Sequence, residues 1–252
     1  MMSAEAFFVS RTLQAMEVLA FRPSSAPEVA GALQVHPRTA RRLLNRLVAD
    51  GWATRSDGRR RIYAPTMRIV ALAAQLAERD PMAVAAAPVV GRLHEETGAA
   101  AHLAIPSYRS ALCLVHRAGG ADTRPQLREL VPAHATAAGK VLLAFRDSWR
   151  ESVLAGELDR PTERTISAPD DLLAELEAIR ERGHALEDEE FLPGVRGVAV
   201  PVRGADGEVA AALALSGPTA DFDAALMAGL ADVLLARAGE IQRALETGGA
   251  HG

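Results

Sequence analysis

The run 37-PRTARRLLNRLVADG-51 has the spacing of a short helix with two opposite faces. At about 100° per residue, its alanine and leucine side chains fall on one face and most of its polar side chains on the other. The polar face carries three arginines and an asparagine, with a threonine and a further arginine on its flank: Arg38, Arg41, Arg42, Asn45, Thr39 and Arg46. Guanidinium and carboxamide groups reach base edges and phosphates from a helix in the major groove. The run therefore predicts a helix that contacts double-stranded DNA.

The segments on either side of this helix fit a winged helix-turn-helix. Upstream, Ser25-Ala26-Pro27-Glu28 has the capping serine and the early proline of a helix start. Downstream, Trp52–Arg55 and Arg59–Tyr63 are predicted strands around Asp57-Gly58, a strong hairpin signal. We expect three basic side chains of this wing to contact phosphates or the minor groove: Arg59, Arg60 and Arg61. The alternative is a three-helix protein-interaction module with a solvated basic face.

Charge is distributed unevenly along the chain, with a basic N-terminal part and an acidic remainder. The 252 residues carry a formal net charge of −4, which by itself argues against nucleic-acid binding. Residues 1–80, however, hold 12 arginines and 7 acidic residues, whereas residues 81–252 are net acidic. This asymmetry is expected of a DNA-binding unit joined to a domain with another role.

Several classes of protein are disfavoured by the sequence. Cys113 is the only cysteine, so an intramolecular disulfide and a cysteine-built zinc site are excluded. No run approaches the roughly 20 apolar residues of a membrane span, and the first residues lack a basic region before an apolar one. We therefore expect a cytoplasmic protein with no membrane association.

Beyond residue 65 the pattern changes from short basic helices to strands framed by helices. Besides the recognition helix, helices are expected at 10–21, 66–80, 81–96, 137–145, 170–182 and 223–245. Strands are expected at 100–105, 112–116, 126–131, 197–202 and 208–215. The predicted fold class is α+β, with an antiparallel sheet covered by helices. We divide the chain into a winged helix-turn-helix (1–65), a connector helix (66–80), a second domain (81–246) and a disordered tail (247–252).

The chain resembles the IclR family of transcription factors over nearly its full length. The most specific stretch, 131-VPAHATAAGKVLLA-144, is similar to the family's P-x-H-A-T-A-x-G-K-A-x-L-A segment. Arg182-Gly183-His184-Ala185 resembles an R-G-Y-A turn, and Leu215-Ser216-Gly217-Pro218 resembles an S-x-S-G-P close. The resemblance implies an N-terminal winged helix for operator DNA and a C-terminal GAF/profilin-like domain that binds a small effector. It also implies a homodimer or tetramer, with dimers joined through the DNA-binding domains.

The resemblance further implies an effector site against the sheet. Its positions on this chain are Ala137, Ala138, Glu187 or Asp188, Gly197, Ala214 and Ser216. Gly197 stands where the family usually has cysteine, and Ala214 where it usually has serine. Because each unmatched polar group of a ligand costs about 1–3 kcal/mol, these departures predict a roomy cavity for a largely apolar or aromatic metabolite.

Other groups of side chains are candidate sites of chemistry. A metal could be bound by His102, His116 and His134 together with Glu187. Their spacing, however, contains no i, i+4 pair or other pattern typical of metal ligands. For His134, the simpler interpretation is that its ring forms a hydrogen bond with the backbone. Asp188-Glu189-Glu190 is interpreted as a solvated acidic turn with one member pointing into the pocket. Lys140 is expected to anchor the domain surface through a salt bridge, and Cys113 to be a buried inert thiol.

We therefore expect no metal, no cofactor and no catalytic residue. The sequence favours an effector-responsive transcriptional regulator that is not an enzyme, and the family resemblance favours a repressor over an activator. Two alternatives remain at this point: an enzyme or metal-dependent sensor that uses the C-terminal cavity, and a ligand-free DNA-binding scaffold.

Overall fold

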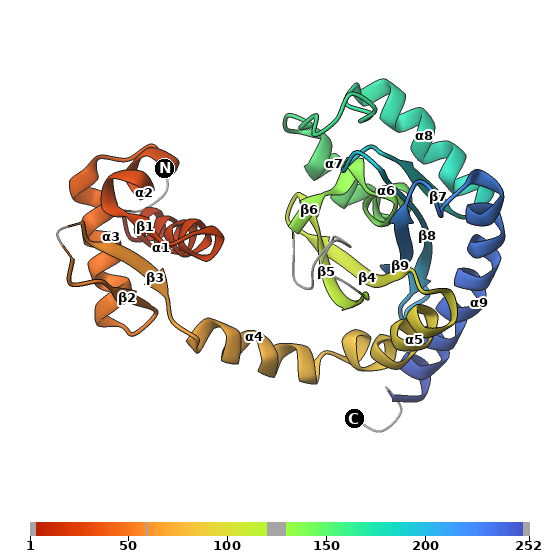
Figure 1. The fold of residues 1–252 in the computed structure, drawn as a ribbon, viewed down its shortest axis with the longest axis horizontal. Coiled ribbons are helices and arrows are strands. Elements are labelled where there is room, and N and C mark those ends of the chain that lie inside the picture. Colours follow the sequence, from red (N-terminus) through yellow and green to blue (C-terminus); the bar gives the residue numbers. More distant parts are fainter. Residues whose placement is uncertain (1–3, 59, 120–129, 249–252) are drawn as a thin grey trace. The chain divides into compact units, whose positions relative to one another are not determined.

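The computed structural model describes residues 4–58, 60–119 and 130–248 and divides into two compact units, Met1–Leu76 and Ala77–Gly252. The first unit packs three helices on a small antiparallel sheet (Figure 1). Its elements are α1 (Ala4–Phe21), β1 (Ser24–Ser25), α2 (Ala26–Ala32), α3 (Pro37–Ala49), β2 (Ala53–Arg55) and β3 (Ile62–Pro65). The buried faces of the three helices meet around Leu19, Val29 and Leu43. The first unit is therefore the winged helix-turn-helix that the sequence predicts.

The wing of this unit differs from the prediction in two ways. β3 is the central strand, in the order β1-β3-β2, and the two-residue strand β1 had no signal in the sequence. β3 begins at Ile62, so Arg60 and Arg61 lie in the loop of the hairpin and not in a strand. Arg59 lies outside the described residues. The loop between β2 and β3 is longer than the predicted hairpin turn, because the pairing of the two strands ends at Arg55 and Tyr63.

Helix α4 (Arg68–Arg79) spans the boundary between the two units in the sequence. None of its side chains is buried, although Val70, Leu72 and Leu76 are apolar. Along the described chain, no helix is long and apolar enough to cross a lipid bilayer.

The second unit is built on a six-stranded antiparallel sheet in the order β6-β5-β4-β9-β8-β7. Its strands are β4 (Ala100–Ser107), β5 (Ser110–Arg117), β6 (Leu130–Pro132), β7 (Ala185–Asp188), β8 (Val195–Arg203) and β9 (Val209–Pro218). One face is covered by α5 (Pro81–Thr97) and α9 (Ala224–Gly248), and the other by α6 (Ala137–Phe145), with α8 (Pro169–Arg182) packed on α6 (Figure 1). This confirms the predicted α+β class.

Four elements of the second unit depart from the expectations. The four-residue strand β7 and the helix α7 (Asp147–Leu154) were not predicted. The strand expected at 126–131 is described only from Leu130, where β6 begins, and its earlier residues lie outside the described part. Helix α9 continues through Gly248, two residues into the predicted disordered tail, and residues 249–252 also lie outside the described part.

Candidate functional site

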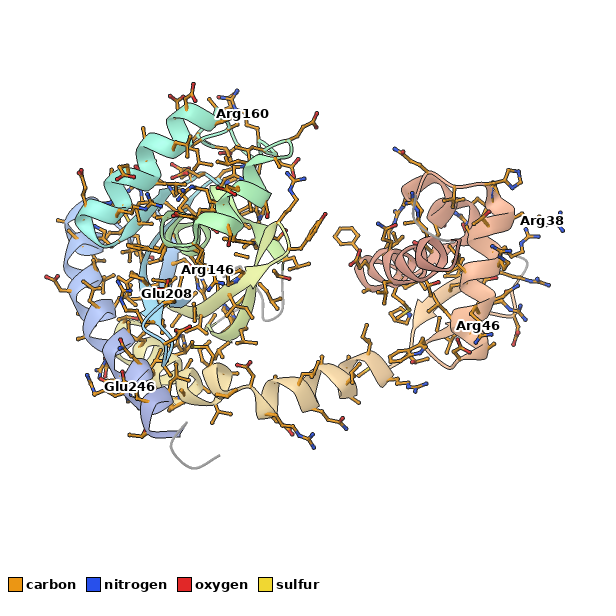
Figure 2. All side chains as sticks on the ribbon, turned by 180° about the vertical axis from the view of Figure 1, so that it is seen from behind. Arg38, Arg46, Arg146, Arg160, Glu208 and Glu246 are labelled. Carbon is orange, nitrogen blue, oxygen red and sulfur yellow. The ribbon has the colours of Figure 1, made fainter. Side chains whose placement is uncertain are left out.

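Helix α3 exposes the basic face that its periodicity predicts. Ala40, Leu43, Leu44 and Leu47 are buried in the core of the first unit. The opposite side is therefore open to solvent, and Figure 2 shows Arg38 and Arg46 extending outward from α3. A groove on this surface is lined by His36, Arg38, Thr39, Arg41, Arg42 and Asn45. The structure thus brings together all the α3 residues that the sequence singled out as contacting DNA.

A second groove connects α3 to the wing. It joins Arg41 to Arg60 and Arg61, and its other walls are the start of α2 and Tyr63. Arg60 is held by an ion pair from its Nη2 to Glu28 Oε1 at 2.9 Å. The same carboxylate accepts hydrogen bonds from the backbone N–H and hydroxyl of Ser25, which lower the pKa of Glu28 to about 2. Sequence reasoning missed this link because the two residues are 32 positions apart.

In the second unit a small cavity lies between the sheet and the start of α6. Its volume is about 20 Å³, roughly the room that one water molecule needs. Ala138, Glu187 and Ser216 line it together with unpredicted residues: His102, Ala104, Cys113, Val131, Thr136, Phe191, Leu192 and Val195. The cavity is smaller than the roomy one predicted, because Phe191, Leu192 and Val195 add bulk that the motif does not indicate.

The remaining predicted effector positions lie beside this cavity or away from it. A Cβ on Gly197 would lie 3.5 Å from Glu187 Oε2 and 3.6 Å from Ser216 Cβ, so Gly197 borders the lining. Ala137 meets the lining through its backbone N–H, which donates to Glu187 Oε2 at 3.3 Å. Ala214 is buried in β9 opposite His102 and does not line the cavity. Asp188 pairs with Arg164 and Arg196, so Glu187 and not Asp188 is the acid at the cavity.

Two polar atoms in the cavity wall have no hydrogen-bond partner among the described residues. They are His102 Nδ1 and Ser216 Oγ, and both side chains are buried. Burial and the neighbouring ring of His116 lower the pKa of His102 to about 3, so its imidazole is neutral. A buried polar atom without a partner costs about 1–3 kcal/mol. The wall therefore offers an unused hydroxyl and an unused imidazole nitrogen to a ligand.

Glu187 adds a group that titrates near neutral pH. Burial raises its pKa to about 7, although the hydrogen bond from Ala137 N–H opposes this rise. Near pH 7 the carboxyl group is present in both its neutral and its ionised form. It can therefore donate a hydrogen bond to a ligand in one form and accept one in the other.

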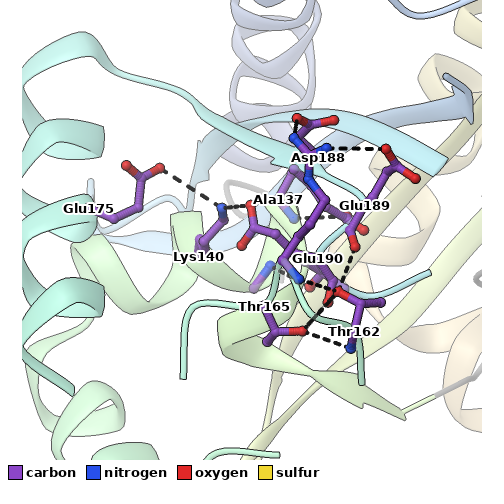
Figure 3. A network of polar contacts seen from close by, with 12 residues as sticks. Ala137, Lys140, Thr162, Thr165, Glu175, Asp188, Glu189 and Glu190 are labelled. Atoms are coloured by element: carbon purple, nitrogen blue, oxygen red, sulfur yellow. Dashed lines mark hydrogen bonds and ion pairs between the residues drawn. The ribbon is translucent and has the colours of Figure 1, made fainter. Parts of the chain in front are cut away.

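Lys140 of α6 takes part in a buried ion pair. Lys140 Nζ lies 2.5 Å from Glu190 Oε1 and 3.9 Å from Glu175 Oε1, as Figure 3 shows. Burial raises the pKa of Glu190, and the attraction of Lys140 opposes this. The salt bridge predicted for Lys140 is confirmed, but its predicted place at the surface is wrong, because Lys140 is 1% exposed. The prediction that one member of the turn Asp188–Glu190 points into the cavity is also wrong, because Glu190 faces Lys140 and Asp188 faces arginines.

His134 and Cys113, the other candidate residues, are held within the fold. His134 Nε2 lies 2.6 Å from the carbonyl oxygen of Asp159, so its ring is bonded to backbone as expected. Cys113 is buried in β5 and lines the cavity. Within the described ranges, no three histidine, cysteine, aspartate or glutamate side chains are placed to hold a metal ion.

Comparisons with known proteins give consistent matches. Residues 74–243 match the family model for the C-terminal domain of the bacterial transcriptional regulator IclR. The chain is 30% identical over 242 residues to the HTH-type transcriptional regulator BhcR of Paracoccus denitrificans, covering 92% of this chain and 85% of that protein. A putative transcriptional regulator from Rhodococcus sp. RHA1 has a TM-score of 0.76 at 27% identity, covering 96% and 98% of the two chains. The inducer-binding domain of PobR from Acinetobacter, solved as a double mutant with 3-hydroxybenzoic acid, has a TM-score of 0.58 at 27% identity, covering 62% and 95%.

Proposed function

This chain belongs to the IclR family of bacterial transcriptional regulators, and we propose that its first unit binds operator DNA while its second unit binds a small effector. α4 would join the two activities. An effector that prefers one arrangement of the second units would shift the spacing of paired winged helices and so change DNA affinity. We further propose that the regulator is a repressor, as the family resemblance favours.

The observation that carries DNA binding is the exposed arginine face of α3, continued by the wing. Arg38, Arg41, Arg42 and Asn45 share one groove, and Arg41 also borders the groove that contains Arg60 and Arg61. A helix with such a face suits the major groove, and the loop of the wing suits the adjacent phosphates. Arg60 is already paired with Glu28, so Arg61 is the better candidate for a phosphate contact.

DNA binding as a dimer is supported by apolar side chains that the described unit leaves uncovered. Leu13 and Phe21 on α1 are 63% and 91% exposed, and Met67, Leu72 and Leu76 at or in α4 are also exposed. Burying such side chains contributes about 25 cal/mol per Å² of apolar surface. We propose that a second copy of the chain covers them, giving a homodimer or tetramer.

The first prediction separates base contacts from phosphate contacts. Arg41→Ala should weaken binding to a duplex selected by the wild-type protein by about 5- to 150-fold and relax the preference at one base pair. Arg61→Ala should weaken binding to all duplexes alike and reduce the salt slope by about one unit. Fluorescence anisotropy over a range of salt concentrations measures both effects. Arg203→Ala, which removes an exposed arginine of the second unit, serves as the control, and equal affinities for all three variants would contradict the proposal.

Effector binding rests on the unpartnered wall atoms, His102 Nδ1 and Ser216 Oγ, beside the titrating Glu187. These groups suit a hydroxyl or carboxyl substituent, whereas Ala104, Val131 and Ala138 suit an apolar ring. The PobR domain, a structural relative, was solved with 3-hydroxybenzoic acid. We therefore propose a largely apolar or aromatic metabolite with at least one polar substituent. Because such a ligand needs a pocket of at least about 300 Å³, its binding would displace Phe191 and Leu192.

The second prediction tests this site with a defined set of probes. 3-Hydroxybenzoate, benzoate and pyruvate are titrated by calorimetry into the wild type, Ser216→Ala and Gly197→Phe. The aromatic hydroxy acid should bind the wild type most tightly, and Ser216→Ala should weaken it about tenfold by removing one hydrogen bond. Gly197→Phe should abolish binding, because its side chain starts beside Glu187 and Ser216, while leaving DNA affinity unchanged. Tight binding of pyruvate alone, unaffected by Gly197→Phe, would contradict the proposal.

A further inference from the structure

One hydrogen bond connects the core of the first unit to its basic surface. Tyr63 is 1% exposed and belongs to the core cluster that holds the three helices together. Its hydroxyl nevertheless reaches α3 and donates to Asn45 Oδ1 at 3.3 Å. Asn45 is exposed and lines the groove that also contains Arg38, Arg41 and Arg42. A buried ring thus contacts the one carboxamide on the predicted recognition surface.

The ring that holds Asn45 is fixed by its place in the sheet. Tyr63 pairs with Ser24 on one side and with Arg55 on the other, so it occupies the central strand. A tyrosine has two side-chain torsions, and burial on a paired strand removes the freedom of both. The phenol oxygen is therefore a stationary donor, unlike the flexible side chains around it.

This contact fixes the direction of the Asn45 carboxamide. An asparagine offers one acceptor oxygen with two lone pairs and one donor NH₂ group on opposite sides of Cγ. Because Oδ1 faces the Tyr63 hydroxyl, Nδ2 is directed away from it. The hydroxyl uses one lone pair of Oδ1, so the carboxamide can still accept a second hydrogen bond while it donates through Nδ2. The contact with Tyr63 therefore sets the orientation in which Asn45 presents both groups to a base edge.

We propose that Tyr63 is a positioning residue that orients the carboxamide of Asn45 and so sets the base preference at one position of the operator. The bases differ in the donors and acceptors that they present in the major groove, so a carboxamide held in one orientation favours one of them. The inference rests on the proposed function, because it requires that α3 enter the major groove.

A purely structural role for the Tyr63 hydroxyl makes a different prediction. If the hydroxyl only stabilises the wing, its removal should lower stability and weaken binding to every duplex by the same factor. If it orients Asn45, its removal should change the base preference at the position that Asn45 reads. The measurement that separates the two is therefore sequence preference, position by position, and not overall affinity.

The test uses the full chain and a pool of randomised DNA duplexes, with the bound fraction sequenced. Four proteins are compared: the wild type, Tyr63→Phe, Asn45→Ala and Tyr108→Phe. Tyr108 is the only other tyrosine and is exposed in the second unit, so Tyr108→Phe is a matched control for loss of a phenol hydroxyl. A thermal melt of each protein identifies any loss of folding.

The wild type and Tyr108→Phe should select the same motif, with one preferred base at a position that Asn45→Ala makes indifferent. Tyr63→Phe should lower the recovery of that base at least about fivefold and leave the other positions unchanged. A Tyr63→Phe motif identical to that of the wild type, or one weakened equally at all positions, would overturn the inference while leaving DNA recognition intact. A wild-type protein that selects no motif would instead overturn the proposed function.

Discussion

Replacing Lys140 by methionine is expected to destabilise the second unit by about 3–5 kcal/mol, because the change leaves the carboxylate of Glu190 buried without a counter-charge. Lys140 is 1% exposed, and its Nζ lies 2.5 Å from Glu190 Oε1. Urea unfolding followed by circular dichroism measures the loss. The loss should be larger at pH 8 than at pH 5. Burial raises the pKa of Glu190, so as the pH falls the carboxyl group takes up a proton and no longer needs the partner.

Two control variants show whether burial is the cause. Arg92→Met breaks a pair with Glu240 in which both side chains are partly exposed, and it should cost less than about 1 kcal/mol. The double variant Lys140→Met, Glu190→Gln removes both charges and should recover much of the stability lost in the single variant. If Lys140→Met were no more costly than Arg92→Met, the buried pair would not stabilise the second unit.

Replacing Gly139 by alanine is the second change from which we expect a large effect, a loss of at least about 3 kcal/mol. A Cβ at this position would lie 2.1 Å from the carbonyl oxygen of Ala133 and 2.5 Å from its Cα. Both atoms belong to the backbone, so the start of α6 would have to move. That start carries two hydrogen bonds, one donated by Gly139 N–H to Thr136 Oγ1 and one donated by Ala137 N–H to Glu187 Oε2. The same variant should therefore also lose effector binding.

Gly229→Ala is the matched control for this prediction. Gly229 lies inside α9, and nothing is within 4 Å of a Cβ built there. Alanine favours a helix over glycine by about 0.5–1 kcal/mol, so this variant should be as stable as the wild type or slightly more stable. Thermal unfolding of both variants makes the comparison. Equal melting temperatures for Gly139→Ala and Gly229→Ala would show that α6 can move away from Ala133 without cost.

Helices and their ends were the most predictable features of this chain. The expected bounds of α6 agree with the structure, and α8 ends as expected before Gly183, which adopts a left-handed conformation with φ of 79°. The two faces of α3 also follow from its periodicity. Each of these features depends on residues within about one helical turn of one another, and that information is present in a short stretch of sequence.

Membership of the candidate cavity was predicted only in part. Ala138, Glu187 and Ser216 were identified through the family motif, and they do line it. His102, Phe191 and Leu192 were not identified as lining residues, because they come from separate segments that only the folded chain brings to the cavity. β7 is four residues long and too short for a period-two pattern to distinguish it from a loop.

The sequence by itself determined the two-faced helix α3, the α+β class and the family, since these depend on local periodicity and on a motif of contiguous residues. Only the tertiary structure decided which charged and polar groups meet. Tyr63 and Asn45 are 18 positions apart, Arg60 and Glu28 are 32 apart, and Lys140 and Glu190 are 50 apart. Each pair forms because strand pairing and helix packing bring distant segments together. Hydrogen bonds and ion pairs act over about 3 Å in space. Between such distant segments they have no characteristic separation along the chain, so no sequence pattern indicates them.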